Sequence, residues 1–170
     1  RSVPFTRELY IDADDFAEVP PPKFFRMKPD GEVRLMGGYI VKCNEIIKDT
    51  DGNVTEIHCT ADLETGNGVP IDGRKVKGTI HWVNAKNCVP CEIRKYDYLL
   101  KDAEYVGQDF SERMNYDSVH EFNALVEPYL ATVEEGKSFQ LLRIGYYKKT
   151  ERNGGSLNEI VSLKDGFKKK

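Results

Sequence analysis

The sequence reads Arg74-Lys75-Val76-Lys77-Gly78-Thr79-Ile80-His81-Trp82-Val83, a stretch in which apolar and polar side chains alternate. Successive side chains of a β-strand point to opposite faces. One face of this predicted strand carries Val76, Gly78, Ile80 and Trp82, and the other carries Lys75, Lys77, Thr79 and His81. The apolar face can enter a core, while the other presents cations and a histidine to an anionic partner. The stretch therefore predicts a β-rich fold with a surface for a polyanion.

Further short strands are predicted on both sides of this stretch. They are expected at residues 33–35, 39–47, 54–60, 75–83, 89–99, 137–150 and 159–163, with a strand or its approach at 5–11. The Asp-Thr-Asp-Gly-Asn turn at 49–53 predicts a hairpin over 38–61. Residues 101–135 lack a β pattern. Within them, Ser118 and Glu121 have capping-box spacing and predict one or two helical turns over 118–124.

Several short strands joined by Gly and Asp turns indicate a barrel or a pair of barrels. We expect an all-β fold of two adjoining β-barrels with one or two short helices. Residues 1–100 would form the first barrel, and residues 101–170 an acidic connector and closing strands that can exchange between barrels. Three prolines at 20–22 hold the chain extended, so that residues 23–27 leave a stiff arm.

Length and composition suit a soluble protein of this size. A chain of 170 residues can form one medium domain or two small barrels, and 39% hydrophobic with 31% charged residues is ordinary for a soluble protein. No apolar run approaches the roughly 20 residues of a membrane span, and no signal peptide precedes the first acidic residues. Because the chain begins at Arg1 without an initiator Met, we expect a piece of a longer protein.

The charge distribution is uneven although the net charge is only −3. Between Lys101 and Glu135, two basic residues face nine acidic ones. Between Lys23 and Lys42, five basic residues face two acidic ones. A local basic surface is compatible with phosphate binding despite the acidic total. Ordinary solvated faces remain the alternative on charge alone.

The cysteines do not indicate a metal site. Cys88 and Cys91 have the C-x₂-C spacing of half a zinc site, but no second close pair exists. Cys43 and Cys59 fall in predicted strands. We therefore expect buried or idle thiols rather than a metal site, reduced in the cytoplasm because no secretory signal is present.

No catalytic residues are predicted. The stretch Gly66-Asn67-Gly68 is too short for a phosphate loop and does not join a strand to a helix. No nucleophile-elbow, zinc-protease or Walker pattern occurs. Acidic pairs such as Glu134-Glu135 suit solvated turns better than an acid–base pair.

The residues favour recognition of single-stranded RNA over catalysis. Such RNA is bound by stacking its bases on aromatic rings and bonding their edges with Arg, Lys, Gln or backbone groups. Phe25 and Arg26 follow the proline arm, and Arg34 begins a strand. Gln140 and Arg143 lie three apart in another predicted strand, on opposite faces unless a bulge intervenes. Core packing, surface ion pairs and a satisfied strand amide remain the alternatives for these residues.

Six segments carry a resemblance to the C-terminal region of class I glutaminyl-tRNA synthetases, along nearly the full chain. They are residues 7–16 (RELYIDADDF), 23–27 (KFFRM), 31–35 (GEVRL), 72–83 (DGRKVKGTIHWV), 89–97 (VPCEIRKYD) and 138–146 (SFQLLRIGY). Related barrels occur in some glutamyl-tRNA synthetases and, more distantly, in a ribosomal protein that binds 5S RNA.

The resemblance implies two β-barrels that open the anticodon loop and hold its three bases in separate pockets. It implies that Arg26 reads the third anticodon base and that Arg34 contacts the first. Gln140 would lie in the pocket for the central uracil, with Arg143 nearby, and Lys23 falls where the family often places a polar side chain.

This chain departs from the family pattern at three positions near these residues. Met36 replaces a second arginine, Leu142 replaces an acidic residue, and Phe25 replaces a residue that is often basic. The family's catalytic His-Ile-Gly-His-like and Lys-Met-Ser-Lys-Ser-like motifs are absent from this sequence. The chain is therefore expected to bind tRNA without activating glutamine and to need no cofactor or metal itself.

Together these observations predict the anticodon-recognition module of a glutaminyl-tRNA synthetase, with Lys75 and Lys77 contacting phosphates. The expected partners are the anticodon loop of tRNA(Gln) and the catalytic domain of the same chain, which would use ATP and Mg; no membrane or DNA partner is expected. The alternatives are a glutamyl-tRNA synthetase module, a ribosomal-type RNA-binding barrel, and a protein-interaction barrel that uses 101–135 as its contact surface.

Overall fold

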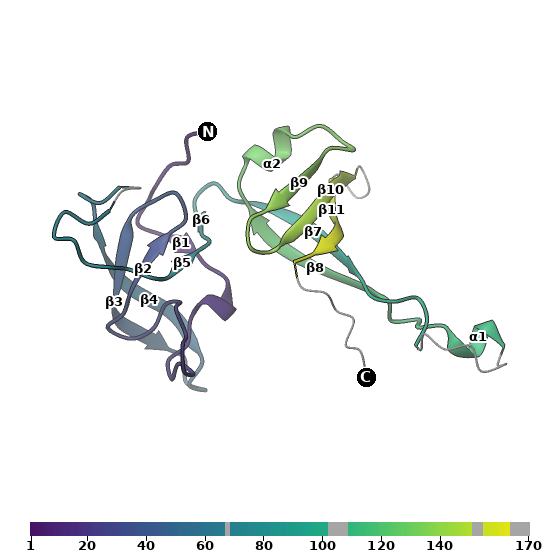
Figure 1. Ribbon diagram of the computed structural model, residues 1–170, viewed down its shortest axis with the longest axis horizontal. Helices are drawn as coiled ribbons and strands as arrows, with labels where there is room; N and C mark the ends of the chain where they lie inside the picture. The colour runs from purple at the N-terminus through teal and green to yellow at the C-terminus, as the bar shows by residue number, and fades with distance from the viewer. Residues whose placement is uncertain (67–68, 102–108, 151–154, 164–170) are drawn as a thin grey trace. The chain divides into compact units, whose positions relative to one another are not determined.

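A computed structural model describes residues 1–66, 69–101, 109–150 and 155–163 of the chain. The chain divides into two compact units, Arg1–Lys86 and Asn87–Lys170. Figure 1 shows each unit with its own sheet. The sequence-based division falls after residue 100, and the two divisions differ over the strand Val89–Tyr96, which pairs with strands of the second unit.

The first unit is built on a four-stranded sheet. Its elements are β1 (Leu9–Tyr10), a 3₁₀ turn (Ala13–Asp15), β2 (Glu32–Leu35), β3 (Ile40–Lys48), β4 (Val54–Asp62), β5 (Thr79–Ile80) and β6 (Val83–Asn84). The strand order is β4-β3-β2-β5, and β1 pairs separately with β6. The predicted hairpin is confirmed as β3–β4. The Asp49 carboxylate closes its turn by accepting hydrogen bonds from the backbone N–H groups of Asp51 (3.0 Å) and Asn53 (2.8 Å).

The stretch 74–83 is only partly a strand. Its burial alternates as predicted over 75–80, where Gly78 and Ile80 are buried while Lys75 and Lys77 are exposed. However, regular pairing is limited to Thr79–Ile80 of β5, which lies parallel to β2, and to the short strand β6. The prediction of one continuous strand is therefore wrong, because residues 75–78 belong to no strand, although the Gly78 carbonyl accepts a hydrogen bond from the Arg34 N–H (2.9 Å).

The core of the first unit lies beneath this sheet. Its buried members are Met27, Val33, Leu35, Val41, Cys43 and Ile80. The N-terminal segment packs against this core, but only Leu9–Tyr10 of it forms a strand, β1, where a strand or its approach was predicted over 5–11. Phe5 instead packs edge-on against Tyr39 and Trp82, at ring-centroid distances of 4.9 and 5.6 Å.

The second unit is built on a five-stranded sheet with two short helices. Its elements are β7 (Val89–Tyr96), α1 (Phe110–Arg113), β8 (Val119–Val126), α2 (Tyr129–Thr132), β9 (Ser138–Leu141), β10 (Gly145–Thr150) and β11 (Ser156–Ser162). The strand order is β8-β7-β11-β10-β9. Its core is centred on Ile93, Tyr147 and Leu157.

Two predictions for the second unit are wrong. Residues 118–124 were predicted to be helical, but 119–126 form β8, which pairs with β7 along its whole length, from Val89↔Val126 to Tyr96↔Val119. The single strand predicted over 137–150 is two strands, β9 and β10, joined by a turn at residues 142–144. The neighbouring β7 satisfies the backbone of β8, and this long-range pairing overrides the local capping signal.

The all-β class is confirmed, and the described residues contain two short α-helices. Closed barrels are not confirmed, because in the described part of the chain the sheets end in unpaired edges. The four-stranded sheet ends at β4 and β5, and the five-stranded sheet ends at β8 and β9. None of the described helices is long and apolar enough to cross a membrane.

Candidate nucleic-acid interface

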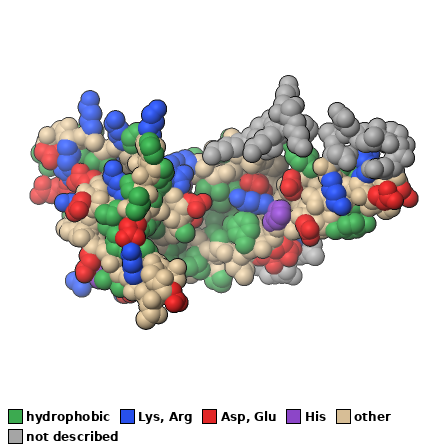
Figure 2. All heavy atoms as spheres, turned by 90° about the horizontal axis from the view of Figure 1, so that it is seen from below, with side chains coloured by type: hydrophobic (Ala, Val, Ile, Leu, Met, Phe, Trp, Pro, Cys, Tyr) green, Lys and Arg blue, Asp and Glu red, His purple; other side chains and the backbone are tan. Residues whose placement is uncertain are grey.

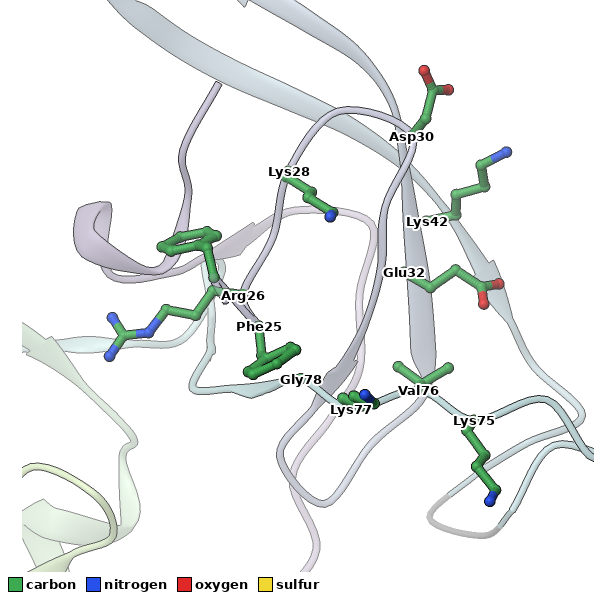
Figure 3. A pocket seen from close by; sticks show the side chains of 11 residues that line it. Phe25, Arg26, Lys28, Asp30, Glu32, Lys42, Lys75, Val76, Lys77 and Gly78 are labelled. Atoms are coloured by element: carbon green, nitrogen blue, oxygen red, sulfur yellow. The ribbon is translucent and has the colours of Figure 1, made fainter. Parts of the chain in front are cut away.

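A basic pocket of about 460 Å³ lies on the first unit. Its lining comprises Phe24, Phe25, Arg26, Lys28, Asp30, Glu32, Lys42, Lys75, Val76, Lys77 and Gly78. Five of these side chains are basic and two are acidic, so the local balance is positive although the chain is acidic overall. Figure 3 shows that they come from three segments: the chain after the proline arm, the β2–β3 pair, and the chain before β5. Such a pocket suits an anionic ligand.

An aromatic ring is exposed in this pocket. Phe25 is 53% exposed, and the Nζ atom of Lys77 lies 5.4 Å from the centre of its ring. Glycine at position 78 permits this arrangement, because a Cβ there would lie 2.3 Å from the Phe25 carbonyl oxygen. An exposed ring beside cations can stack a base while the cations meet its phosphate.

The proline arm ends in a turn that sets the direction of residues 24–28. The Phe24 N–H donates to the Pro21 carbonyl (3.2 Å), and Lys23 adopts a left-handed conformation with φ 63°. Lys23 is exposed but does not line the pocket. It directly precedes Phe24, which lines the pocket.

Arg26 is anchored in the first unit by an acidic residue. Its Nη1 donates to the Asp14 carbonyl (3.0 Å) and lies 2.9 Å from the Asp15 carboxylate. Asp15 is only 6% exposed, whereas the Arg26 side chain is 40% exposed. The backbone fixes the two side chains close together, because the Met27 N–H donates to the Asp15 carbonyl (2.9 Å). In Figure 3 the Arg26 guanidinium extends away from the labelled lysines.

Arg34 lies outside the basic pocket. Its neighbours Val33 and Leu35 point into the core, so Arg34 shares the opposite face of β2 with Glu32. Its Nη1 donates to the Gly66 carbonyl (3.1 Å), which ties β2 to the loop after β4. The structure therefore does not bring Arg34 together with Arg26 in one pocket, and the expectation of separate base pockets stays a prediction.

Gln140 and Arg143 lie on the second unit. Gln140 is exposed on β9, between Phe139 and Leu141, which pack on the core. Arg143 is exposed in the turn between β9 and β10 and has φ 67°, a left-handed conformation that is uncommon outside glycine. The expectation that Arg143 lies in a strand is therefore wrong, and the opposite-face argument for this pair does not apply.

Sequence reasoning did not select two pocket lysines, Lys28 and Lys42. Both belong to the basic run of 23–42, so the signal was present in the charge count. The charge count over residues 23–42 does not show which of these basic side chains line the same pocket. In Figure 2, Lys and Arg side chains are interspersed with Asp and Glu on the face shown, so the positive character is local.

The thiols and other donors do not form a metal centre in the described residues. No group of three or more His, Cys, Asp or Glu side chains there could hold an ion. All four cysteines are thiols rather than disulfide partners. Burial raises the pKa of Cys43 and of Cys91, and raises the pKa of Cys59 to about 11. These three thiols are therefore protonated at neutral pH and are weak nucleophiles.

Comparison with known proteins matches both parts of the chain to one kind of domain. Two family models, each described as tRNA synthetases class I (E and Q), anti-codon binding domain, match residues 1–62 and 79–150. The chain is also similar to proteins named glutamine–tRNA ligase. Identity is 48% to that of Clostridium perfringens, covering 100% of this chain, and 46% to those of Clostridioides difficile and Rhodopirellula baltica, each covering 99%. The chain spans 32%, 32% and 29% of these relatives, or about a third of their length.

Proposed function

We propose, from the premise that this chain belongs to the anticodon-binding domains of the class I (E and Q) tRNA synthetases, that it binds the anticodon loop of a glutamine tRNA. The similarity to glutamine–tRNA ligases over the whole chain supports glutamine as the amino acid. The observation that carries the proposal is the basic pocket with Phe25 exposed beside Lys77. Stacking of an unpaired base next to its phosphate is how proteins commonly hold single-stranded RNA loops.

The residues divide into two roles in this proposal. Lys75 and Lys77 contact phosphates, which fixes the position of the loop without reading its sequence. Arg26, Arg34 and Gln140 contact base edges and supply the sequence preference. Lys23 and Arg143, both exposed in turns, would lie near the loop and assist its binding.

The complete protein would be a glutamine–tRNA ligase acting in the cytoplasm. It would attach glutamine to its tRNA with ATP and Mg in a catalytic domain, which is also the second partner of this chain. The chain itself would contribute binding and no catalytic step. The share of the relatives that it matches, about a third, supports this division.

Fluorescence anisotropy with an RNA stem-loop tests the proposal directly. The chain is titrated at low salt with a stem-loop that carries a glutamine anticodon, and with a copy altered only at the central uracil. Tighter binding of the unaltered loop is expected. Equal binding of both loops would reduce the proposal to a general basic surface, and absence of binding would contradict it.

A glutamate anticodon serves as the third RNA in the same titration, because the matching family includes synthetases for both amino acids. Preference for that loop would replace glutamine by glutamate in the proposal. Arg34→Ala is then the first variant to examine. If it weakened binding to every anticodon equally, Arg34 would be a general contact and not a base-reading residue.

A further inference from the structure

Arg74 binds three carboxylates at once at the edge of the basic pocket. Its Nε lies 3.0 Å from the Glu32 carboxylate, its Nη2 lies 2.6 Å from that of Asp62, and its Nη1 lies 2.7 Å from that of Asp72. The Asp72 carboxylate also accepts a hydrogen bond from the Arg74 backbone N–H (3.1 Å). Each guanidinium nitrogen therefore already faces an anion, although Arg74 immediately precedes the lysines expected to bind phosphate.

This cluster joins two hollows of the first unit. Glu32 lines the basic pocket, while Arg74, Asp62 and Asp72 line a second hollow of about 280 Å³. The Glu32–Arg74 ion pair connects them. Figure 3 shows the Glu32 carboxylate on the same side of the pocket as Lys42, with Lys75 at its lower edge. Loss of Arg74 would therefore leave the Glu32 carboxylate in the basic pocket without this cation beside it.

Arg74 favours the ionised form of two of these carboxylates, those of Asp62 and Asp72. Hydrogen bonds from Arg74 lower the pKa of Asp62 and of Asp72 below the usual value of an aspartate. The side chains of Glu32 and Asp62 are 32% and 30% exposed, while that of Asp72 is 59% exposed. Individual surface ion pairs add little to stability. Their more important effect here is on the potential that an approaching phosphate meets.

We infer that Arg74 is a positioning residue of the RNA-binding surface: it holds Glu32, Asp62 and Asp72 and thereby keeps three carboxylates from repelling the phosphates bound by Lys75 and Lys77. This inference rests on the proposed function. It assigns Arg74 no contact with RNA, since a guanidinium binds phosphate through the same fork of donors that the carboxylates occupy.

A double-mutant comparison tests the inference. Stem-loop binding is measured by anisotropy for Arg74→Ala in the unaltered chain and in a chain carrying Glu32→Gln, Asp62→Asn and Asp72→Asn. In the unaltered chain the substitution should weaken binding about tenfold, because like charges brought together across an interface are costly. In the neutralised background the same substitution should change binding by less than about threefold, since the repelling groups are gone.

Lys75→Ala is the matched control because Lys75 is the next residue and is exposed. As a direct phosphate contact it should lose the same factor in both backgrounds. If Arg74→Ala behaved like Lys75→Ala, Arg74 would itself contact RNA and the inference would be overturned. If the unaltered chain bound no stem-loop, the proposed function would fail first and this inference with it.

A second variant covers the case in which Arg74→Ala does not fold, which the urea midpoint followed by the fluorescence of Trp82 would show. Glu32→Gln alone removes one repelling carboxylate and leaves two ion pairs to Arg74. Stem-loop binding should be unchanged or tighter. Weaker binding would mean that Glu32 orients Arg74 to contact the RNA, which contradicts the inference.

Discussion

Gln140 lies directly opposite Tyr146 in the antiparallel pair of β9 and β10, and both residues are exposed. Side chains opposite each other in such a pair share one face of the sheet and lie within reach of one another. Gln140 offers both a hydrogen-bond donor and an acceptor, and Tyr146 offers a ring for stacking. This face of the second unit therefore has the groups needed to hold one RNA base by its edge and its plane.

Gln140→Leu should remove discrimination at the central anticodon base. Loss of the amide would cost about 1–3 kcal/mol of preference for uracil, on the scale known for base readout in DNA. Competition anisotropy with stem-loops that differ only at that base measures the change. Ser138→Ala is the control, because Ser138 is exposed two residues earlier on the same face of β9. Equal effects of the two substitutions would remove Gln140 from the recognition residues.

Arg26→Ala should destabilise the first unit as well as weaken RNA binding. It removes one ion-pair partner of Asp15, a buried carboxylate, and such losses cost about 1–3 kcal/mol. Trp82 is the single tryptophan and lies in the first unit, so urea unfolding followed by its fluorescence reports this unit. Arg7→Ala is an exposed control that should leave the midpoint unchanged. An unchanged midpoint for Arg26→Ala would show that the ion pair does not stabilise the fold.

Phe25→Ala should weaken binding of every stem-loop, whatever its anticodon. Stacking on one aromatic ring contributes about 1–3 kcal/mol per base and does not depend strongly on which base is stacked. Because Phe25 is 53% exposed, its removal should disturb the core little. Phe25→Tyr keeps the ring and should bind as the unaltered chain does. Full affinity of Phe25→Ala, measured by anisotropy, would exclude the ring from the RNA surface.

The stability of the first unit should depend on pH through His58. Hydrogen bonds from the ring to Glu56 (3.1 Å) and Glu45 (3.2 Å) raise the pKa of His58 in the folded chain. Protonated His58 is therefore favoured by folding. Its contribution is complete below the unfolded pKa of about 6.5 and is lost as the pH rises through the folded pKa.

The urea midpoint of the first unit should thus fall between pH 5.5 and pH 8.5 by more in the unaltered chain than in His58→Gln. The effect should be small because all three side chains are more than half exposed. His120→Gln, in the second unit, is the control and should leave this pH dependence intact. Identical pH profiles for the unaltered chain and His58→Gln would contradict the prediction.

Lys149→Met should destabilise the second unit. The Lys149 ammonium donates to three backbone carbonyls, those of Leu130 (3.0 Å), Ala131 (3.0 Å) and Val133 (2.6 Å), at the end of α2. Removing these bonds to a charged donor should cost about 1–3 kcal/mol. Hydrogen exchange of the β9 amides would report the loss as faster exchange. Lys148→Met, at the exposed neighbouring position, should leave exchange unchanged, and equal rates for both variants would disprove the prediction.

The elements that sequence predicted correctly are those set by local chemistry. The hairpin of β3 and β4 depends on a turn closed by Asp49, and both of its strands contain many β-branched residues. The alternation over 75–80 could be predicted for the same reason, because the two-residue period of a strand depends only on adjacent residues.

The wrong predictions occur where the secondary structure depends on residues far apart in the sequence or on an unusual turn residue. In β8, Phe122 and Leu125 are exposed, so the strand has no clear apolar face, and only its pairing with β7 identifies it. The turn between β9 and β10 places Arg143, and not a glycine, at positive φ, so the usual turn signal is missing.

The candidate site shows the same division. The sequence by itself determined the family, the basic run of 23–42 and the exposed lysines before β5, because these follow from residue type and order. Only the tertiary structure decided which cations converge on one pocket, that Arg26 is held by Asp15, and that Arg74 is occupied by three carboxylates. Ion pairs join residues up to 42 positions apart in the chain, and a linear pattern does not contain the distances that select them.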